Sequence, residues 1–312
     1  MSEIKHWNTC RISGETLVPL FSLGEPHVSD FLPKDAEPRS TKVPLELCLA
    51  PQSGLVQLAH TAPFDQMYQS YWYKSATNES MVEELRQIAA STTRLMRIGT
   101  GDVWVDIGCN DGTLLSFLPA EATRIGFDPN DFKDISEKHA DLIVNDYFHA
   151  KSFRASHYGN EKVKIITSIA MFYDLEDPHA FVRDIDDILD ENGLWVIQMS
   201  YLPLMLEQLA FDNICHEHLE YYSLTALKHL LDAHGMSIVD CQLNDVNGGS
   251  FRIYIRKQKA DPSVFGSAPY RDVAAYRVRS ILEYEKTLNL MYPATYHDFY
   301  KKACGLRDET SA

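Results

Sequence analysis

The fold is decided by Val103–Leu115, VWVDIGCNDGTLL, which predicts a buried strand, a tight glycine turn and the start of a helix. Its first five residues are apolar or β-branched apart from one acid, as in a strand that is covered on both faces. A second apolar segment, residues 124–128 (RIGFD), follows and also ends in an acid. Strand, glycine turn, helix and a second strand ending in an acid are the order of a nucleoside-binding βαβ unit. The stretch therefore predicts an α/β fold with a doubly wound parallel sheet.

Two acids of this stretch, Asp106 and Asp111, indicate which nucleoside would bind. A pyrophosphate binds to the N–H groups at a helix N-terminus, and two negative charges there would repel it. S-adenosylmethionine has no phosphate and carries a sulfonium, an amino group and a ribose diol instead. We expect Asp106 to face the amino-acid end of this ligand and Asp128 to accept hydrogen bonds from both ribose hydroxyls. The predicted cofactor is therefore S-adenosylmethionine, with S-adenosylhomocysteine as its product.

Further predicted strands bring polar and aromatic side chains to the same edge of the sheet. Residues 142–148 (LIVNDYF) contain Asp146, which could bind the adenine amino group, and Phe148, which could stack on the base. Residues 164–168 (KIITS) form the next strand and end in a serine. In such sheets, ligands bind at the carboxyl ends of the strands. The predicted cofactor-binding residues are Asp106, Gly108, Asn110, Gly112, Asp128, Asp146, Phe148 and Ser168.

The composition limits the partners and the compartment. The 312 residues are 45% hydrophobic and 23% charged, which indicates a folded globular protein long enough for two domains. The net charge of −15 argues against nucleic acid or an anionic membrane as the main partner. There is no apolar run of membrane-spanning length and no apolar signal segment, so we expect a cytoplasmic protein with reduced cysteines. The oligomeric state stays open.

The chain divides into three predicted parts. Residues 1–62 form a small β-rich module of short apolar segments separated by glycine and proline. Residues 63–258 form the α/β domain, with an insertion after its fifth strand. Residues 259–312 form a helical extension that ends in a polar tail.

Cys10 and Cys48 each stand where a C-x-x-C zinc knuckle could begin. The partner positions are Ser13 and Pro51, which do not bind zinc, and a structural zinc site needs four Cys or His ligands. We therefore expect a zinc-ribbon-like module that has lost its metal, and we predict no metal-binding residues.

The densest cluster of ionisable residues is His216-Glu217-His218, which lies between the apolar Ile214 and Leu219. Histidine is the side chain best suited to exchange protons near neutral pH, which favours a general base here. Two other interpretations stay open. H-x-H can bind a metal, although no third ligand is evident, and the cluster can be a structural hydrogen-bond network.

Five motifs occur together in this chain. They are Asn110-Asp111-Gly112, residues 211–224 (FDNICHEHLEYYSL), residues 247–254 (NGGSFRIY), an N-terminal pattern that includes GLVQL at 54–58, and Tyr71 with Tyr73-Lys74-Ser75. Together they resemble the sugar C-methyltransferase family, whose members methylate nucleotide-linked 4-keto-deoxysugars. The resemblance implies a class I methyltransferase sheet, a zinc-binding N-terminal module and a C-terminal nucleotide-sugar domain, before which this chain ends. The expected partner is a small molecule, namely a nucleotide sugar.

By this resemblance, Glu217 and His218 are catalytic and His216 lies beside them. His218 would take a proton from the sugar carbon next to the ketone, and that carbon would then attack the sulfonium methyl group in line. Tyr73 is expected to close the pocket from the opposite side. The predicted substrate-binding residues are Tyr71, Tyr173, Asn247 and Gly248.

Three departures from the family pattern keep other functions open. Two zinc cysteines are missing, Cys215 stands where the family has tyrosine, and residues 171–174 (MFYD) contain no histidine after the fourth strand. The first alternative is a methyltransferase that acts on oxygen or nitrogen of another small polar metabolite. The second is a non-catalytic cofactor- or sugar-binding partner of a separate protein.

Overall fold

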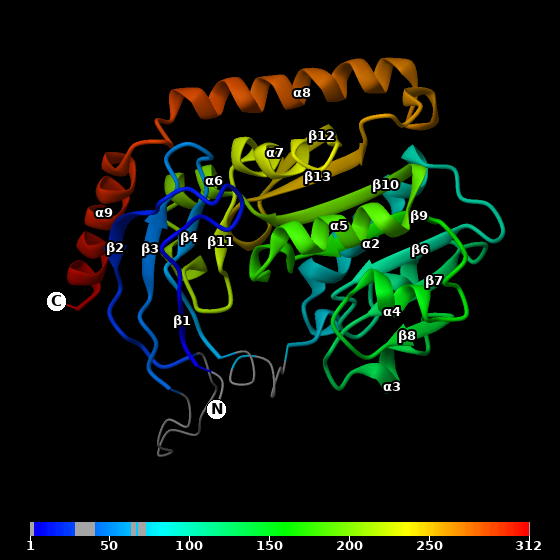
Figure 1. Cartoon of the computed structure of the whole chain (residues 1–312), viewed down its shortest axis with the longest axis horizontal. Helices are drawn as coiled ribbons and strands as arrows, with labels where there is room; N and C mark the ends of the chain where they lie inside the picture. Colours follow the sequence, from blue (N-terminus) through cyan, green and yellow to red (C-terminus); the bar gives the residue numbers. More distant parts are fainter. Residues whose placement is uncertain (1–2, 29–40, 64–66, 68–72, 312) are drawn as a thin grey trace.

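The computed structural model describes residues 3–28, 41–63, 67 and 73–311 (Figure 1). Its centre is a seven-stranded sheet in the order β12-β13-β10-β9-β6-β7-β8, which confirms the predicted α/β fold. Strands β6 to β10 pair in parallel, and the β12–β13 hairpin continues the sheet antiparallel to β10. The strands are β6 (Val103–Ile107), β7 (Thr123–Phe127), β8 (Leu142–Val144), β9 (Val163–Ile169), β10 (Leu189–Ser200), β12 (Met236–Asn244) and β13 (Ser250–Lys257).

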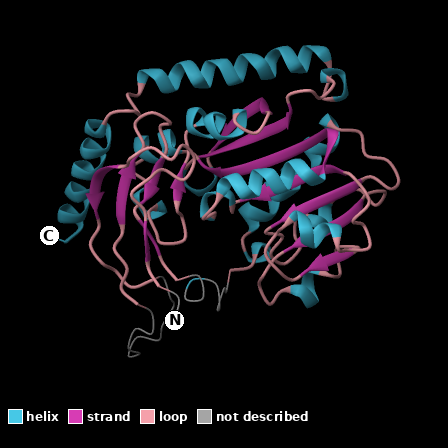
Figure 2. Ribbon diagram, viewed as in Figure 1, coloured by secondary structure: helices cyan, strands magenta, loops and turns pink. Residues whose placement is uncertain are grey.

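Helices cover both faces of this sheet (Figure 2) because its middle strands are apolar on both sides. All five residues of β6 are buried. Helix α5 (Pro178–Ile188) begins after Asp177, whose side chain accepts a hydrogen bond from the Ala180 N–H. The other α-helices are α2 (Glu79–Leu95), α3 (Lys133–Ser136), α4 (Ala150–Arg154), α6 (Leu202–Glu207), α7 (Leu224–Asp232), α8 (Ala268–Thr287) and α9 (Pro293–Ser311). Within the described ranges, no helix has the length and apolar character needed to cross a membrane.

The segment after the glycine turn differs from the prediction. The helix expected there is only a single 3₁₀ turn, η2 (Leu115–Phe117). Pro119 follows closely, and a proline disfavours the helical conformation of the residue before it. The prediction of a helix was wrong because too few residues separate Gly112 from this proline.

The N-terminal module takes one of its strands from the middle of the chain. Its four-stranded sheet has the order β11-β4-β3-β2, and a separate pair joins β1 to β5. Strand β11 pairs Glu220 with Gln57 and Tyr221 with Val56, so the segment after His216-Glu217-His218 belongs to the N-terminal sheet. Helix α9 lies along β2 in Figure 1, where His297 Nε2 donates a hydrogen bond to the Leu20 carbonyl. The strands are β1 (Lys5–His6), β2 (Val18–Ser22), β3 (Glu46–Leu49), β4 (Val56–Leu58), β5 (His60–Thr61) and β11 (Glu220–Tyr221).

Candidate functional site

A cavity of about 550 Å³ opens at the carboxyl ends of β6, β7 and β9. This is the edge at which parallel α/β sheets bind ligands, and the volume suits a small molecule. Seven of the predicted site residues line the cavity: Tyr73, Asp106, Gly108, Asn110, Asp128, Asp146 and Phe148. The structure therefore brings together most of the predicted cofactor-binding residues.

Two predicted cofactor residues do not line the cavity. Ser168 is fully buried and its Oγ accepts a hydrogen bond from Trp195 Nε1 at 3.2 Å. Gly112 has φ +79°, and a Cβ there would lie 2.9 Å from the Ser136 Cα. Ser168 thus bonds two strands of the sheet, and Gly112 allows the turn to pass close to Ser136. Contact of either residue with a cofactor stays a prediction.

Asp106, near the end of β6, is almost completely buried. Thr167 Oγ1 donates a hydrogen bond to its Oδ1 at 2.6 Å. Burial raises the pKa of Asp106 to about 7, the Thr167 hydrogen bond acts in the opposite direction, and the nearby charge of Asp128 raises it further. At neutral pH this carboxyl group is therefore close to the midpoint of its titration.

Asp128, directly after β7, is held by two backbone amides. Its Oδ2 accepts from the Asn110 N–H at 2.8 Å and its Oδ1 from the Asn130 N–H at 2.9 Å. Burial raises its pKa, while these hydrogen bonds act to lower it. Each carboxylate oxygen accepts more than one hydrogen bond, so both can still bind a hydroxyl group in the cavity.

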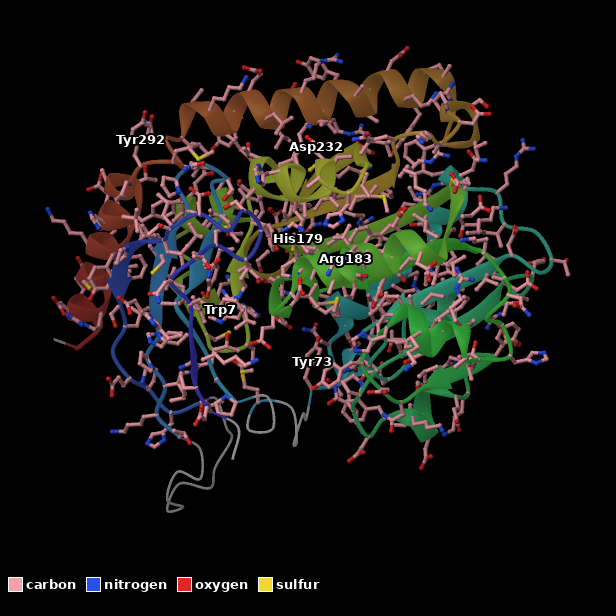
Figure 3. The ribbon with its side chains drawn as sticks, in the orientation of Figure 1. Trp7, Tyr73, His179, Arg183, Asp232 and Tyr292 are labelled. Atoms are coloured by element: carbon pink, nitrogen blue, oxygen red, sulfur yellow. The ribbon has the colours of Figure 1, made fainter. Side chains whose placement is uncertain are left out.

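The side chains of Asn110 and Asp111 clamp the segment that carries Tyr73. Asn110 donates from Nδ2 to the Tyr73 carbonyl and accepts at Oδ1 from the Ser75 N–H, both at 3.0 Å. Asp111 Oδ2 accepts from the Ala76 N–H at 2.9 Å. Tyr73, labelled in Figure 3, is thereby fixed at the cavity. This task of the turn was not predicted, because the partner residues lie 35 positions away in the sequence.

The aromatic part of the lining contains Phe148 and Tyr147. Phe148 packs edge-on against Phe127, with ring centroids 5.2 Å apart, and is part of the core. Tyr147 is 44% exposed and is the more accessible ring. Stacking of a base on Phe148 stays a prediction, and Tyr147 is a second candidate that the sequence reasoning did not single out.

The His216-Glu217-His218 cluster lies outside the described lining of the cavity. His216 is buried, and its Nε2 lies 3.0 Å from the Val43 carbonyl, to which it can only donate. His218 Nδ1 lies 2.8 Å from the Asn213 carbonyl, so this nitrogen carries the proton and Nε2 of a neutral ring can accept one. Glu217 is half-buried beside them. The catalytic roles of these three residues stay predictions.

His218 is tied to the cavity wall through Tyr173. The two rings lie 4.3 Å apart, and the Leu219 N–H donates to the Tyr173 carbonyl at 2.8 Å. The next residue, Asp174, lines the cavity. His218 therefore packs against Tyr173, directly beside the residue that forms this part of the wall.

Asp174 is the most buried of four acidic lining residues that were not predicted as site residues; the others are Glu176, Asp177 and Asp184. The Oδ1 of Asp174 is buried and has no hydrogen-bond partner among the described residues. Burial raises its pKa well above the ordinary value, with His218 acting to lower it. No motif marks this acid, although its position just after β9, at the ligand-binding edge of the sheet, was a usable signal.

The predicted substrate residues that the structure describes, Tyr173, Asn247 and Gly248, are absent from the lining of the cavity. Asn247 and Gly248 lie in a turn with φ of 51° and 75°, next to Asn213. Asn213 Nδ2 lies 3.5 Å from the Asn247 carbonyl, so the turn supports the residue that orients His218. Tyr71 lies outside the described residues. A role of these residues in substrate binding stays a prediction.

Among curated proteins, the chain is similar to C-methyltransferase NovU of Streptomyces niveus, with 24% identity over 260 residues. The alignment covers 82% of this chain and 62% of NovU, so the chain spans less than two thirds of that relative. Among solved structures, the plantazolicin methyltransferase BpumL with S-adenosylhomocysteine matches at TM-score 0.43 and 13% identity, covering 55% of this chain and 82% of that one. The N-methyltransferase NodS of Bradyrhizobium japonicum matches at TM-score 0.40 and 12% identity, covering 57% and 86%.

Two family models match the chain. One, described as "Putative zinc binding domain", covers residues 10–68, the region of the N-terminal module. The other, described as "Methyltransferase domain", covers residues 80–240. This range includes β6 to β10 and every residue of the cavity lining except Tyr73 and Ser75. This second match extends over more than half of the chain and confirms the predicted enzyme class. The chain belongs to the methyltransferase domain family.

Proposed function

We propose that this chain is an S-adenosylmethionine-dependent C-methyltransferase that acts on a keto-deoxysugar linked to a nucleotide. The observation that carries the proposal is the cavity at the carboxyl ends of the parallel strands, with Asp106 and Asp128 in its wall. The similarity to C-methyltransferase NovU supports carbon as the methylated atom. The sugar as substrate rests on the resemblance of the motifs at residues 211–224 and 247–254 to those of the sugar C-methyltransferase family.

The residues in the cavity suit the chemical groups of the cofactor. When bound, S-adenosylmethionine supplies a methyl group on a positively charged sulfur. Asp128 accepts hydrogen bonds from the ribose hydroxyls, and the ionised form of Asp106 attracts the ammonium group. Both acids lie in a largely buried wall, where a hydrogen bond to a charged group contributes more than it does in water.

In this proposal His218 accepts a proton from the substrate, and Asp174 donates a hydrogen bond to it. The neutral imidazole of His218 takes a proton at Nε2 from the carbon next to the sugar ketone, because its Nδ1–H is already donated to Asn213. Asp174, whose pKa is raised by burial, keeps its proton and donates a hydrogen bond to the ketone oxygen as negative charge develops there. The carbon would then form its new bond to the methyl group as the bond between that methyl group and sulfur breaks. S-adenosylhomocysteine would leave, the ketone would be restored, and His218 would keep the proton until it passes to solvent.

A transfer assay tests this function. The chain is incubated with methyl-labelled S-adenosylmethionine and a nucleoside-diphosphate-linked 4-keto-deoxyhexose, and the product is analysed by NMR. We expect a new C–CH₃ group and the loss of one C–H proton of the sugar. Label on an oxygen or nitrogen atom would contradict C-methylation, and binding of the cofactor without any transfer would favour a non-catalytic binding partner.

Asp128→Ala is expected to weaken S-adenosylhomocysteine binding roughly ten- to a hundredfold, because a charge-assisted contact to the ribose is lost. Calorimetry measures the affinity. Asp131→Ala is the matched control, because Asp131 is an exposed acid three residues away and outside the cavity lining. Equal affinity of wild type and Asp128→Ala would contradict the placement of the ribose on Asp128.

A further inference from the structure

The N-terminal module contains two matching turns. The first, residues 10–14, is closed by a hydrogen bond from the Gly14 N–H to the Cys10 carbonyl at 2.9 Å. The second, residues 50–54, is closed by the Gly54 N–H and the Ala50 carbonyl at 2.8 Å. Gly14 and Gly54 adopt φ of 70° and 76°, a left-handed conformation that favours glycine. The two turns are thus equivalent, position by position.

This equivalence corrects the position of the second knuckle. The sequence suggested that it begins at Cys48, but Cys48 is in β3 and its thiol is buried, with a pKa raised to about 11 by burial and by Glu46. The residues that correspond to Cys10 and Ser13 are Ala50 and Ser53. The earlier assignment was wrong because C-x-x-P happens to overlap the turn by two residues.

The two turns do not fit a structural zinc ion. Such an ion needs four thiolate or imidazole ligands. The four equivalent positions hold one thiol, two hydroxyl groups and one methyl group: Cys10, Ser13, Ser53 and Ala50. Cys10 Sγ lies 3.5 Å from Ser53 Oγ, within the distance of a hydrogen bond. Across the described ranges of the chain, no three His, Cys, Asp or Glu side chains are grouped so that they could hold a metal.

A carboxylate occupies the position between the turns instead. Glu15 Oε2 accepts a hydrogen bond from the Gln52 N–H, and its Oε1 accepts from the Ser53 N–H, both at 2.8 Å. Ser13 Oγ also donates to Oε1 at 2.8 Å. One side chain therefore bonds the first turn and the second turn together. We propose that Glu15 cross-links the two turns in place of a structural zinc ion, so that the module folds without metal.

The cross-link bears on the candidate active site through Arg11, which lies inside the first turn. Arg11 Nη1 donates to the Leu58 carbonyl at 3.0 Å, and its Nε lies 3.6 Å from Glu220 Oε1, with both side chains fully buried. Glu220 follows His218 by two residues and forms β11. The first turn thus contacts, through Arg11 and Glu220, the strand that directly follows His218. This contact does not depend on which substrate the protein acts on.

Metal analysis and thermal unfolding of the 312-residue chain test the cross-link. We expect far less than one zinc per chain after expression with added zinc, and a Tm that does not change with EDTA. Glu15→Gln keeps the size of the side chain but removes the charge, and should lower Tm by about 2–4 °C. Glu25→Gln, an exposed glutamate in the same module, should leave Tm unchanged. One zinc per chain with a chelator-sensitive Tm, or equal Tm values for Glu15→Gln and wild type, would overturn the proposal.

A second variant tests the equivalence in the opposite direction. Ser13→Cys, Ala50→Cys and Ser53→Cys together with Cys10 place four thiols on the two turns. We expect this triple variant to bind one zinc per chain and to tolerate Glu15→Gln when zinc is present, because the metal then supplies the cross-link. This comparison also applies if Glu15→Gln alone does not fold. Failure of the triple variant to bind zinc, or no rescue of Glu15→Gln by zinc, would refute the exchange of metal for carboxylate.

Discussion

His218→Asn is expected to lower kcat by about a hundredfold to ten-thousandfold, the usual contribution of a general base. Affinity for S-adenosylhomocysteine should stay nearly unchanged, because His218 is absent from the described lining of the cavity that holds the predicted cofactor residues. Asparagine retains an N–H donor but has no nitrogen that accepts a proton. Single-turnover kinetics with labelled cofactor, together with calorimetry, separate the chemical step from binding.

His216→Asn is the informative control. His216 is buried and donates to the Val43 carbonyl, which belongs to the N-terminal part of the chain. Its replacement should lower Tm and should affect kcat less than His218→Asn does. If both variants lose cofactor binding in parallel with activity, the cluster is a structural hydrogen-bond network. The proton acceptor must then be sought among Tyr71, Tyr73, Tyr173 and Asp174.

The parts of this structure that local patterns encode were predictable. Residues 103–107 are apolar, β-branched and followed by a glycine turn, and they form the central strand β6. Asp106 and Asp128 line the cavity because each lies at the carboxyl end of a strand. In a parallel sheet these ends meet at the edge where ligands bind. These features depend only on residues close together in sequence.

The contacts between distant segments could not be predicted in the same way. The pairing of β11 with β4 joins Glu220 to Gln57, and no residue pattern in either segment specifies the other. The hydrogen bond from Asn110 to the Tyr73 carbonyl could not be predicted either. An asparagine after a strand predicts a turn, but it does not predict which distant residue its side chain will bind. Asp174 was not predicted, because a single acid in the sequence does not indicate a site. It becomes a candidate only because the fold buries its Oδ1 without a hydrogen-bond partner among the described residues. Long-range packing decides all three.

Asp106→Asn is expected to stabilise the ligand-free protein above neutral pH. Burial raises the pKa of Asp106 to about 7 in the folded state, whereas the unfolded chain has the ordinary value of 3.8. Between these values the unfolded state releases its proton first, so the wild type loses stability as pH rises from about 4 to about 7. A shift of this size corresponds to roughly 4 kcal/mol at most. Asparagine does not titrate and avoids the loss.

Thermal unfolding at pH 5 and pH 8 measures this effect. The gap in Tm between Asp106→Asn and wild type should be larger at pH 8 than at pH 5. Asp134→Asn, which removes an exposed carboxylate on α3, should show the same pH dependence as wild type. Parallel Tm profiles for Asp106→Asn and wild type would contradict the raised pKa of Asp106.

Asp106→Asn should also weaken cofactor binding. On this view, Asp106 costs stability in the ligand-free protein but contributes to the binding of the cofactor. An ammonium group beside Asp106 favours its ionised form, so ligand binding should lower the pKa of Asp106 and release a proton near pH 7. Affinity for S-adenosylhomocysteine should therefore rise with pH up to about 7 and level off above it in the wild type. In Asp106→Asn this dependence should vanish, and the affinity should be low throughout. Calorimetry in buffers of different ionisation enthalpy detects the released proton, and equal proton release in both proteins would exclude Asp106 as the group that meets the ammonium.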